Sequence, residues 1–176
     1  TRTISSAASD VYKRQQISVN MITDNNVSYC IIGHSEAREY LNESNEDIKA
    51  KYDLLIKNKV KPIVCIGESL ETRESNETFD FITKQLEHFK NIEDEITFAY
   101  EPIWAIGTGL VPSDDDIKQV VKHIRSHFSQ TIKVLYGGSV KGENASNLLN
   151  NLDIDGVLVG GASLNPQEFA KIAQSC

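Results

Sequence analysis

Ile96-Thr-Phe-Ala-Tyr-Glu101, followed at once by Pro102, is the stretch that decides the fold. Its apolar residues run almost continuously instead of alternating with polar ones, which is typical of a strand buried on both faces of a parallel sheet. Similar runs occur elsewhere in the chain. Together they predict strands at 28–33, 62–66, 96–100, 132–136 and 155–159.

Amphipathic helices are predicted between these strands. The clearest is expected at about 114–128, with Ser113 as its N-cap and Asp116 three residues further on. Further helices are expected at about 18–26, 45–58, 76–90 and 143–151, and from Asn165-Pro166 onward. The side chains that these patterns place in the core are Ile48, Tyr52, Leu55, Ile56, Phe79, Ile82, Leu86, Phe89, Ile117, Val120, Val121, Ile124, Phe128, Leu148, Leu149, Phe169 and Ile172.

Alternating strands and helices with short connections indicate an α/β fold with a parallel sheet and right-handed crossovers. A doubly wound sheet and a (β/α)₈ barrel both fit this pattern. The barrel is favoured, because the candidate chemical groups follow several different strands and no Gly-x-Gly-x-x-Gly turn is present. Only five strands are predicted, whereas this barrel needs eight. The sequence therefore predicts a partial barrel, an open sheet with exposed edges.

Composition narrows the class of function. The 176 residues carry a net charge of −7, which disfavours nucleic acid and membrane surfaces as partners because no basic field covers the protein. The three cysteines are odd in number and lack metal-ligand spacing, so we expect neither a disulfide framework nor a metal site. No apolar run approaches the length of a membrane span. A reducing cytoplasm is the expected location.

Glu101 and His34 are the candidate catalytic residues, and each stands where an apolar strand ends. A strand-end glutamate alone is more often the partner of a nearby lysine. Here the apolar segment 102–106 follows, and folding of that segment over the site would expel water and raise the basicity of the carboxylate. Glutamate is one of the usual bases for removing a proton next to a carbonyl.

A lone histidine is more often a structural hydrogen-bonding group. His34, however, opens a helical turn through residues 35–37, and the positive end of that turn disfavours a protonated ring. A neutral imidazole can donate a hydrogen bond to a carbonyl oxygen without carrying charge. Glu36 is either a simple cap partner or a neighbour of the site.

Two glycine motifs, Gly137-Gly-Ser139 and Gly160-Gly161, follow the last two predicted strands. Each alone is consistent with a tight strand-to-helix turn. Together they match the place where barrels bind phosphate through backbone N–H groups. Cys65-Ile-Gly-Glu68 is interpreted as core and supporting structure, whereas Arg73 and the Lys57–Lys61 cluster are predicted to be solvated surface.

With these motifs in view, the chain resembles the triosephosphate isomerase family from about Ser18 to Ala173. The resemblance rests on five stretches that occur in the family's order, which are Gly33-His-Ser-Glu36, Cys65-Ile-Gly-Glu68, Ala99-Tyr-Glu-Pro-Ile-Trp-Ala-Ile-Gly-Thr-Gly109, Tyr136-Gly-Gly-Ser-Val140 and Gly156-Val-Leu-Val-Gly-Gly-Ala-Ser-Leu164. The resemblance implies a TIM barrel of which the fourth to eighth strand–helix units are present here.

It also implies an enzyme of glycolysis and gluconeogenesis that interconverts dihydroxyacetone phosphate and glyceraldehyde 3-phosphate through an enediol, without cofactor. Its partner is a small phosphorylated triose, and the family forms homodimers. The segment Pro102–Pro112 would be a lid. The residues that the resemblance assigns are His34 and Glu101 to catalysis, Gly107, Ser139, Gly160 and Gly161 to substrate binding, and Glu36 and Tyr136 to support, with Tyr136 as a latch for the lid.

The chain also departs from the family pattern. The family begins with three strand–helix units whose first loop carries an asparagine and a lysine that reach the substrate, and neither has a matching position here. The dimer-forming loop is absent apart from an edge near Gln16, and Ala37 stands where arginine is common. We expect residues 1–16 to be an unrelated or disordered head, residues 1–15 being unlike the family, and residues 17–176 to be the C-terminal two thirds of a barrel domain.

Three functions are therefore weighed. The first is an isomerase whose sequence here is incomplete. The second is a non-catalytic fragment or a phosphate-binding module. The third is another phosphate-binding barrel enzyme, such as a synthase of the tryptophan or histidine pathways, and the segment around Glu101 argues against it.

Overall fold

The computed structural model describes residues 17–93, 95–106, 110 and 112–175. The predicted head at 1–16 and the predicted phosphate-binding residue Gly107 lie outside these residues. The described elements, in chain order, are α2 (Val19–Asp24), β1 (Tyr29–Ile32), α3 (Ser35–Tyr40), α4 (Asn45–Lys57), β2 (Lys61–Ile66), α5 (Leu70–Glu74), α6 (Thr78–Leu86), η1 (Glu87–Phe89), β3 (Thr97–Tyr100), η2 (Ile103–Ala105), α7 (Asp114–Ser126), β4 (Lys133–Tyr136), α8 (Ala145–Asn151), β5 (Gly156–Val157), η3 (Gly161–Leu164) and α9 (Pro166–Ala173).

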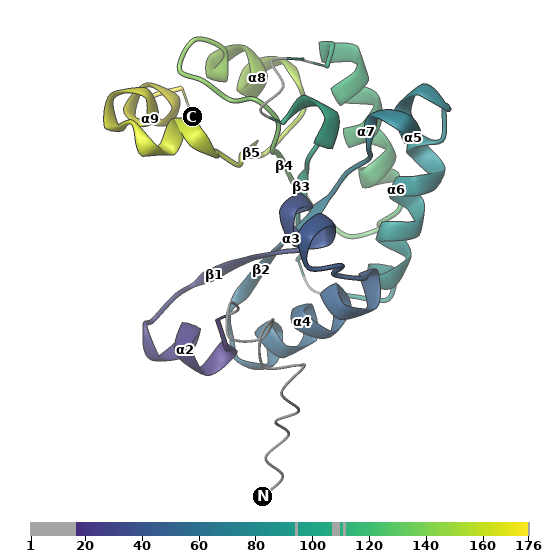
Figure 1. The fold of residues 1–176 in the computed structure, drawn as a ribbon, viewed down its shortest axis with the longest axis vertical. Coiled ribbons are helices and arrows are strands. Elements are labelled where there is room, and N and C mark those ends of the chain that lie inside the picture. The colour runs from purple at the N-terminus through teal and green to yellow at the C-terminus, as the bar shows by residue number, and fades with distance from the viewer. Residues whose placement is uncertain (1–16, 94, 107–109, 111, 176) are drawn as a thin grey trace, which may run out of the picture.

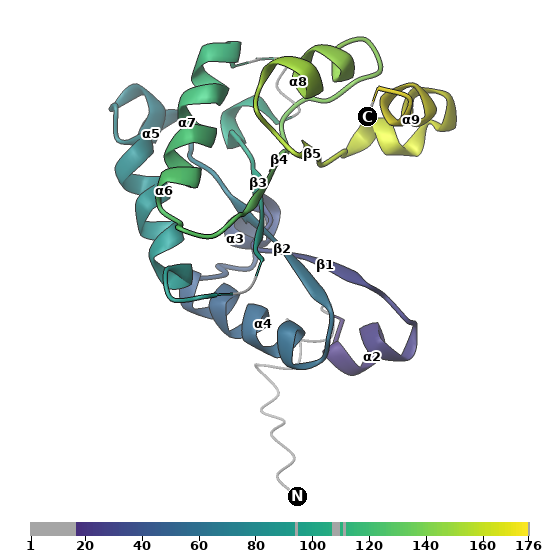
Figure 2. The same ribbon diagram turned by 180° about the vertical axis from the view of Figure 1, so that it is seen from behind.

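The five described strands form one parallel sheet in the order β1-β2-β3-β4-β5. The sheet curves, with α4, α6, α7 and α8 along its outer side and with α2 and α9 at its two ends, as the opposite views of Figures 1 and 2 show. This arrangement confirms the predicted α/β class and is consistent with a partial barrel.

Strand register explains which side chains meet the helices. Ile32, Val64, Phe98 and Val134 form one row across four strands, and all four are buried. The row one residue earlier begins with Ile31, which is 47% exposed. Because successive side chains on a strand point to opposite faces, the helices cover one face of β1 and leave the other open.

Local sequence sets where the two longest helices begin. Ser44 caps α4 and Ser113 caps α7, each as part of a reciprocal capping box with an aspartate three residues on. The prediction that Ser113 and Asp116 start the helix is therefore confirmed. Such caps satisfy backbone donors that have no partner within the helix.

Three side chains predicted to be buried are exposed instead, namely Ile56, Phe79 and Phe169. Each lies on the margin of its helix's apolar stripe, which is wider than the surface that the helix presents to the sheet. Phe79 packs on the ring of His123, 4.8 Å between centroids, and not in the core. The strand β5 is also shorter than the predicted range 155–159. It pairs only with β4 among the described residues, so fewer ladder bonds define its end.

Candidate functional site

Glu101 lies directly after β3 with only 2% of its surface exposed. Its backbone N–H donates to the carbonyl oxygen of Ile66 at 2.8 Å, which extends the ladder between β2 and β3 past the last strand residue. Two glycines make room for it. A Cβ atom on Gly67 would lie 1.7 Å from the Glu101 carbonyl oxygen, and one on Gly137 would lie 2.9 Å from Glu101 Cγ. The glycines at these strand ends therefore permit the close approach that buries the carboxylate.

His34 follows β1 and is the N-cap residue of α3. Its Nδ1 atom accepts a hydrogen bond from the backbone N–H of Glu36 at 3.4 Å, so the neutral ring carries its proton on Nε2. Nε2 lies 3.1 Å from Glu101 Oε1. The other carboxylate oxygen of Glu101 accepts the backbone N–H of Ser35 at 3.1 Å. The imidazole and the carboxylate, 67 positions apart in sequence, are thus in direct contact.

The electrostatics of His34 differ from the sequence expectation. The hydrogen bond to Glu101 raises the pKa of His34 above its usual value, and partial burial lowers it by less. The charges of Glu101 and Glu36 also raise it. The six-residue helix α3 offers only a weak positive end, whereas the carboxylate lies at hydrogen-bond distance. While this contact exists, the protonated ring is favoured relative to an isolated imidazole.

A hollow of about 700 Å³ opens beside this pair. Its lining includes His34 and Glu101 together with Ser139, Gly160 and Gly161, so five of the predicted site residues border one space. Ser139 donates its hydroxyl hydrogen to the carbonyl oxygen of Ala105 at 2.9 Å, which ties the loop after β4 to η2. A Cβ atom on Gly160 or Gly161 would meet nothing within 4 Å, so protein packing does not explain these two glycines.

The two predicted supporting residues do not border the hollow. Glu36 is exposed and contributes its backbone N–H to the His34 ring. Tyr136 is buried, and among the described residues its hydroxyl has no hydrogen-bond partner. Burial raises the pKa of Tyr136 to about 12. Its role as a latch for the lid remains a prediction, since residues 107–109 and 111 lie outside the described part of the chain.

Sequence reasoning missed Arg38, which follows Ala37 on α3. Its guanidinium donates to the carbonyl oxygens of Gly33 at 2.8 Å and Cys65 at 3.0 Å, and to the side chain of Asn45 at 2.7 Å. One side chain therefore joins the carboxyl ends of β1 and β2. Nothing in the local sequence distinguishes it from a surface arginine, because its partners come from three separate segments.

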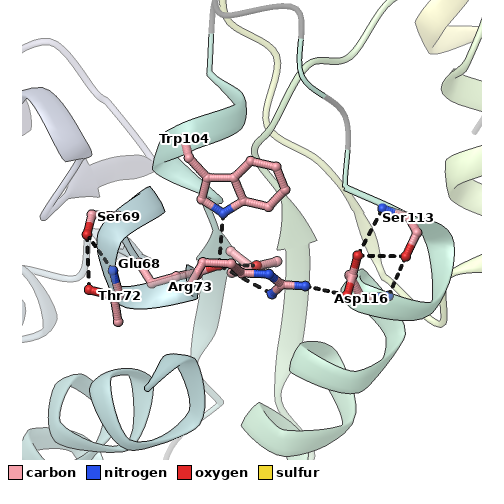
Figure 3. A network of polar contacts seen from close by, with 8 residues as sticks. Glu68, Ser69, Thr72, Arg73, Trp104, Ser113 and Asp116 are labelled. Atoms are coloured by element: carbon pink, nitrogen blue, oxygen red, sulfur yellow. Dashed lines mark hydrogen bonds and ion pairs between the residues drawn. The ribbon is translucent and has the colours of Figure 1, made fainter. Parts of the chain in front are cut away.

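The prediction that Arg73 is solvated surface is wrong. Its side chain is only 22% exposed, contacts Glu68 at 3.5 Å, pairs with Asp116, and lies over the ring of Trp104 with 5.6 Å to the centroid. Figure 3 shows this cluster between α5, η2 and the start of α7. Glu68 was predicted to be supporting structure, and it is fully buried next to the segment that contains Glu101.

Two further observations concern other functions. Within the described residues, no three His, Cys, Asp or Glu side chains gather as metal ligands would. The same part of the chain contains no helix with the length and apolar character needed to cross a membrane.

Comparison with known proteins gives consistent results. Residues 14–176 match the family model described as triosephosphate isomerase. The chain is 49% identical over 170 residues to the triosephosphate isomerase of Alkaliphilus oremlandii, an alignment that covers 89% of this chain and 68% of the relative. It is 46% identical over 159 residues to that of Mesomycoplasma hyorhinis, covering 89% of this chain and 65% of the relative.

The triosephosphate isomerase of Finegoldia magna is 39% identical over 189 residues, with 96% of this chain and 75% of the relative covered. The chain thus spans about two thirds to three quarters of the length of these three curated relatives. Identity at this level over most of the chain, together with the family model, places it among them. The chain belongs to the triosephosphate isomerase family.

Proposed function

We propose that His34 and Glu101 interconvert dihydroxyacetone phosphate and D-glyceraldehyde 3-phosphate by proton transfer through an enediol. The observation that supports this most directly is the 3.1 Å contact between His34 Nε2 and Glu101 Oε1 at the edge of one hollow. An acid–base pair within reach of one small guest is the geometry that a proton shift between adjacent carbons needs.

Glu101 is the base in this proposal. Its carboxylate takes a proton from the hydroxyl-bearing carbon next to the ketone of dihydroxyacetone phosphate, and an enediol forms. The same carboxylate then returns a proton to the neighbouring carbon, which gives the aldehyde. The Ser35 N–H that holds Oε2 leaves Oε1 as the oxygen that faces His34 and the guest.

His34 handles the oxygen atoms. Its Nε2 transfers a proton to the substrate carbonyl oxygen as negative charge develops there, which completes the enediol, and the same Nε2 then takes the proton of the other hydroxyl as the enediol collapses to the aldehyde. The Glu36 N–H that donates to Nδ1 fixes the tautomer with Nε2 as the donor. A guest that separates Glu101 from His34 also removes the main contribution that raises the histidine pKa, so the ring then favours its neutral form.

The phosphate end of the guest is assigned to Ser139, Gly160 and Gly161. Gly160 and Gly161 have open space where a side chain would be, which lets a ligand approach their backbone N–H groups closely. Local N–H donors suit a phosphate dianion in a chain of net charge −7, because they hold the anion against overall repulsion. Gly107 is assigned to the same task from sequence alone.

The proposal includes the family's wider setting. We assign residues 17–176 to the fourth to eighth strand–helix units of a barrel, and the chain to homodimers in the cytoplasm. The exposed side chains of Met21, Tyr29 and Ile31 border an apolar groove of about 920 Å³ at the β1 edge, where the third strand–helix unit of a complete barrel would pack. The homodimer is proposed from the family resemblance alone. A non-catalytic phosphate-binding module is the alternative, and it needs the glycine loops but not the contact between His34 and Glu101.

A coupled isomerase assay tests the proposal. It compares this chain with a fusion that adds the part of the Alkaliphilus oremlandii relative that this chain does not match, and Glu101→Gln in each background is the matched control. We expect turnover in the fusion that Glu101→Gln abolishes. If neither protein shows turnover but both still bind inorganic phosphate, the result supports the non-catalytic phosphate-binding module instead. Turnover that survives Glu101→Gln contradicts the assignment of the base.

A further inference from the structure

We propose that Arg73 is a positioning residue for the backbone on both sides of Glu101, and that it acts through Glu68. Its guanidinium joins the two ends of the segment that follows Glu101, over a buried carboxylate that holds the end of β3. The consequence of this inference for catalysis rests on the proposed role of Glu101 as the base. Its evidence is the cluster drawn in Figure 3, whose contacts do not include the hollow.

The first end of the segment is held by Glu68. The Glu68 carbonyl oxygen accepts the backbone N–H of Ile103 at 3.1 Å. Its carboxylate atom Oε1 accepts the hydroxyl hydrogen of Tyr100 at 3.1 Å and the indole N–H of Trp104 at 3.0 Å. Glu68 therefore accepts hydrogen bonds from both sides of Glu101. The donors are Tyr100 before it and Ile103 and Trp104 after it.

The second end of the segment is the start of α7. Ser113 and Asp116 form its capping box, in which Asp116 Oδ2 accepts the Ser113 hydroxyl hydrogen at 2.6 Å. The other carboxylate oxygen of Asp116, Oδ1, pairs with Arg73. One oxygen thus fixes the helix start and the other fixes its position relative to α5.

Arg73 connects these two ends because its planar guanidinium has several donors on one rigid group. One terminal nitrogen reaches Glu68 Oε1 at 3.5 Å, the other reaches Asp116, and the plane lies over the Trp104 ring. One cation therefore contacts both ends of the segment. Ile103 and Trp104 lie at the first end and Asp116 lies at the second. The shared cation constrains the distance between the two ends.

Charge gives Arg73 a second effect on the cluster. Burial raises the pKa of Glu68, whereas the hydrogen bonds from Trp104 and Tyr100 and the charge of Arg73 lower it. Glu68 Oε2 is buried and has no hydrogen-bond partner among the described residues. Arg73 is thus the cation that favours the ionised Glu68, and an ionised carboxylate is the stronger acceptor for the two donors that hold β3 and η2.

Trp104 is the one tryptophan of the chain, so its indole N–H gives a single signal in a ¹⁵N-resolved NMR spectrum. That signal reports the hydrogen bond to Glu68 in this chain without any need for turnover. A loss of isomerase activity and a loss of the bridge are therefore observed separately. The experiment records the indole signal against pH in the wild type, Arg73→Met, Arg73→Lys and Asp116→Asn.

In Arg73→Met we expect the indole proton to move upfield, because Glu68 becomes a weaker acceptor. The pH midpoint of its titration should rise, because the substitution removes a positive charge that favours the ionised carboxylate. Arg73→Lys keeps the charge but cannot reach both carboxylates, so its midpoint should fall between those of wild type and Arg73→Met. Asp116→Asn should shift the signal in wild type and add nothing in Arg73→Met.

Arg125→Met is the matched control. Arg125 is 28% exposed and pairs with Asp155 at 2.8 Å, but it contacts none of the residues in the cluster. It should lower stability and leave the Trp104 signal in place. An indole signal unchanged in Arg73→Met and Asp116→Asn, a shift of equal size in Arg125→Met, or a wild-type signal at the position of an unfolded indole would each overturn the inference.

Discussion

Shortening Glu101 by one methylene, in Glu101→Asp, should separate the two groups at the centre of the proposed site. The carboxylate retreats by about one C–C bond, roughly 1.5 Å. The distance from His34 Nε2 to the carboxylate, 3.1 Å in the structure, then becomes roughly 4.6 Å, beyond hydrogen-bond range. Because that hydrogen bond is the main cause of the raised histidine pKa, the pKa of His34 should fall toward 6.5.

The sign of the pH dependence follows from the direction of this shift. A histidine whose pKa is raised in the folded state stabilises the protein below the pKa of the unfolded chain, and this contribution is lost as pH rises through the folded pKa. Glu101→Asp should therefore lower the free energy of unfolding more at pH 5 than at pH 8. In a catalytically competent protein, a base misplaced by about 1 Å also costs roughly 100-fold in turnover.

The assay is an NMR titration of the histidine ring protons. The chain has four histidines, and His34→Asn identifies the resonance that matters. Glu168→Asp is the control, because Glu168 borders the same hollow but pairs with Lys171 at 3.0 Å. If His34 titrates at the same pH in Glu101→Asp as in the wild type, the contact between the two side chains does not exist in solution and the reasoning fails.

Three further predictions concern packing and assembly. Phe98→Ala removes a fully buried ring and should cost about 3–5 kcal/mol in urea unfolding, and a loss below about 1 kcal/mol would show that the helices do not cover the sheet as described. Gly137→Ala places a methyl group 2.9 Å from Glu101 Cγ and should reduce turnover of the isomerase fusion without preventing folding, so an unchanged rate would argue against this close approach. Ile31→Lys puts a charge on the exposed edge strand β1 and should reduce edge-to-edge self-association of this chain in sedimentation velocity. Leu164→Lys, at an exposed position on η3, should leave association unchanged, and equal effects of the two lysines would show that the β1 edge does not drive that association.

Much of the fold follows from periodicity alone. The runs at 62–66, 96–100 and 132–136 predict strands within one residue of those observed, because strands that are buried on both faces are apolar throughout. The helix starts at Ser44 and Ser113 are also readable, since capping chemistry is local. The burial of side chains at the edge of a helix's apolar face is not predictable in this way. Phe79 satisfies the helical pattern, but only the placement of the neighbouring α7 decides that it packs on His123.

The candidate site shows the same division. The meeting of His34 and Glu101 is predictable, because the carboxyl ends of parallel strands gather at one edge of a sheet. The contacts that two arginines make near the site are not predictable from the sequence. Arg38 and Arg73 stand on short polar helices, and each reaches a partner far away in sequence, Cys65 for Arg38 and Asp116 for Arg73. A charged residue looks like solvated surface until tertiary structure shows which carbonyl or carboxylate groups it reaches.

The central claim is that His34 and Glu101 act together on one phosphorylated triose. The most direct measurement is the exchange of solvent deuterium into dihydroxyacetone phosphate, followed by proton NMR with the isomerase fusion and with the same fusion carrying Glu101→Gln. We predict exchange at the hydroxyl-bearing carbon next to the ketone in the unchanged fusion and only the uncatalysed rate in its Glu101→Gln variant. Equal exchange in the two proteins would contradict the claim, whether both are fast or both remain at the uncatalysed rate.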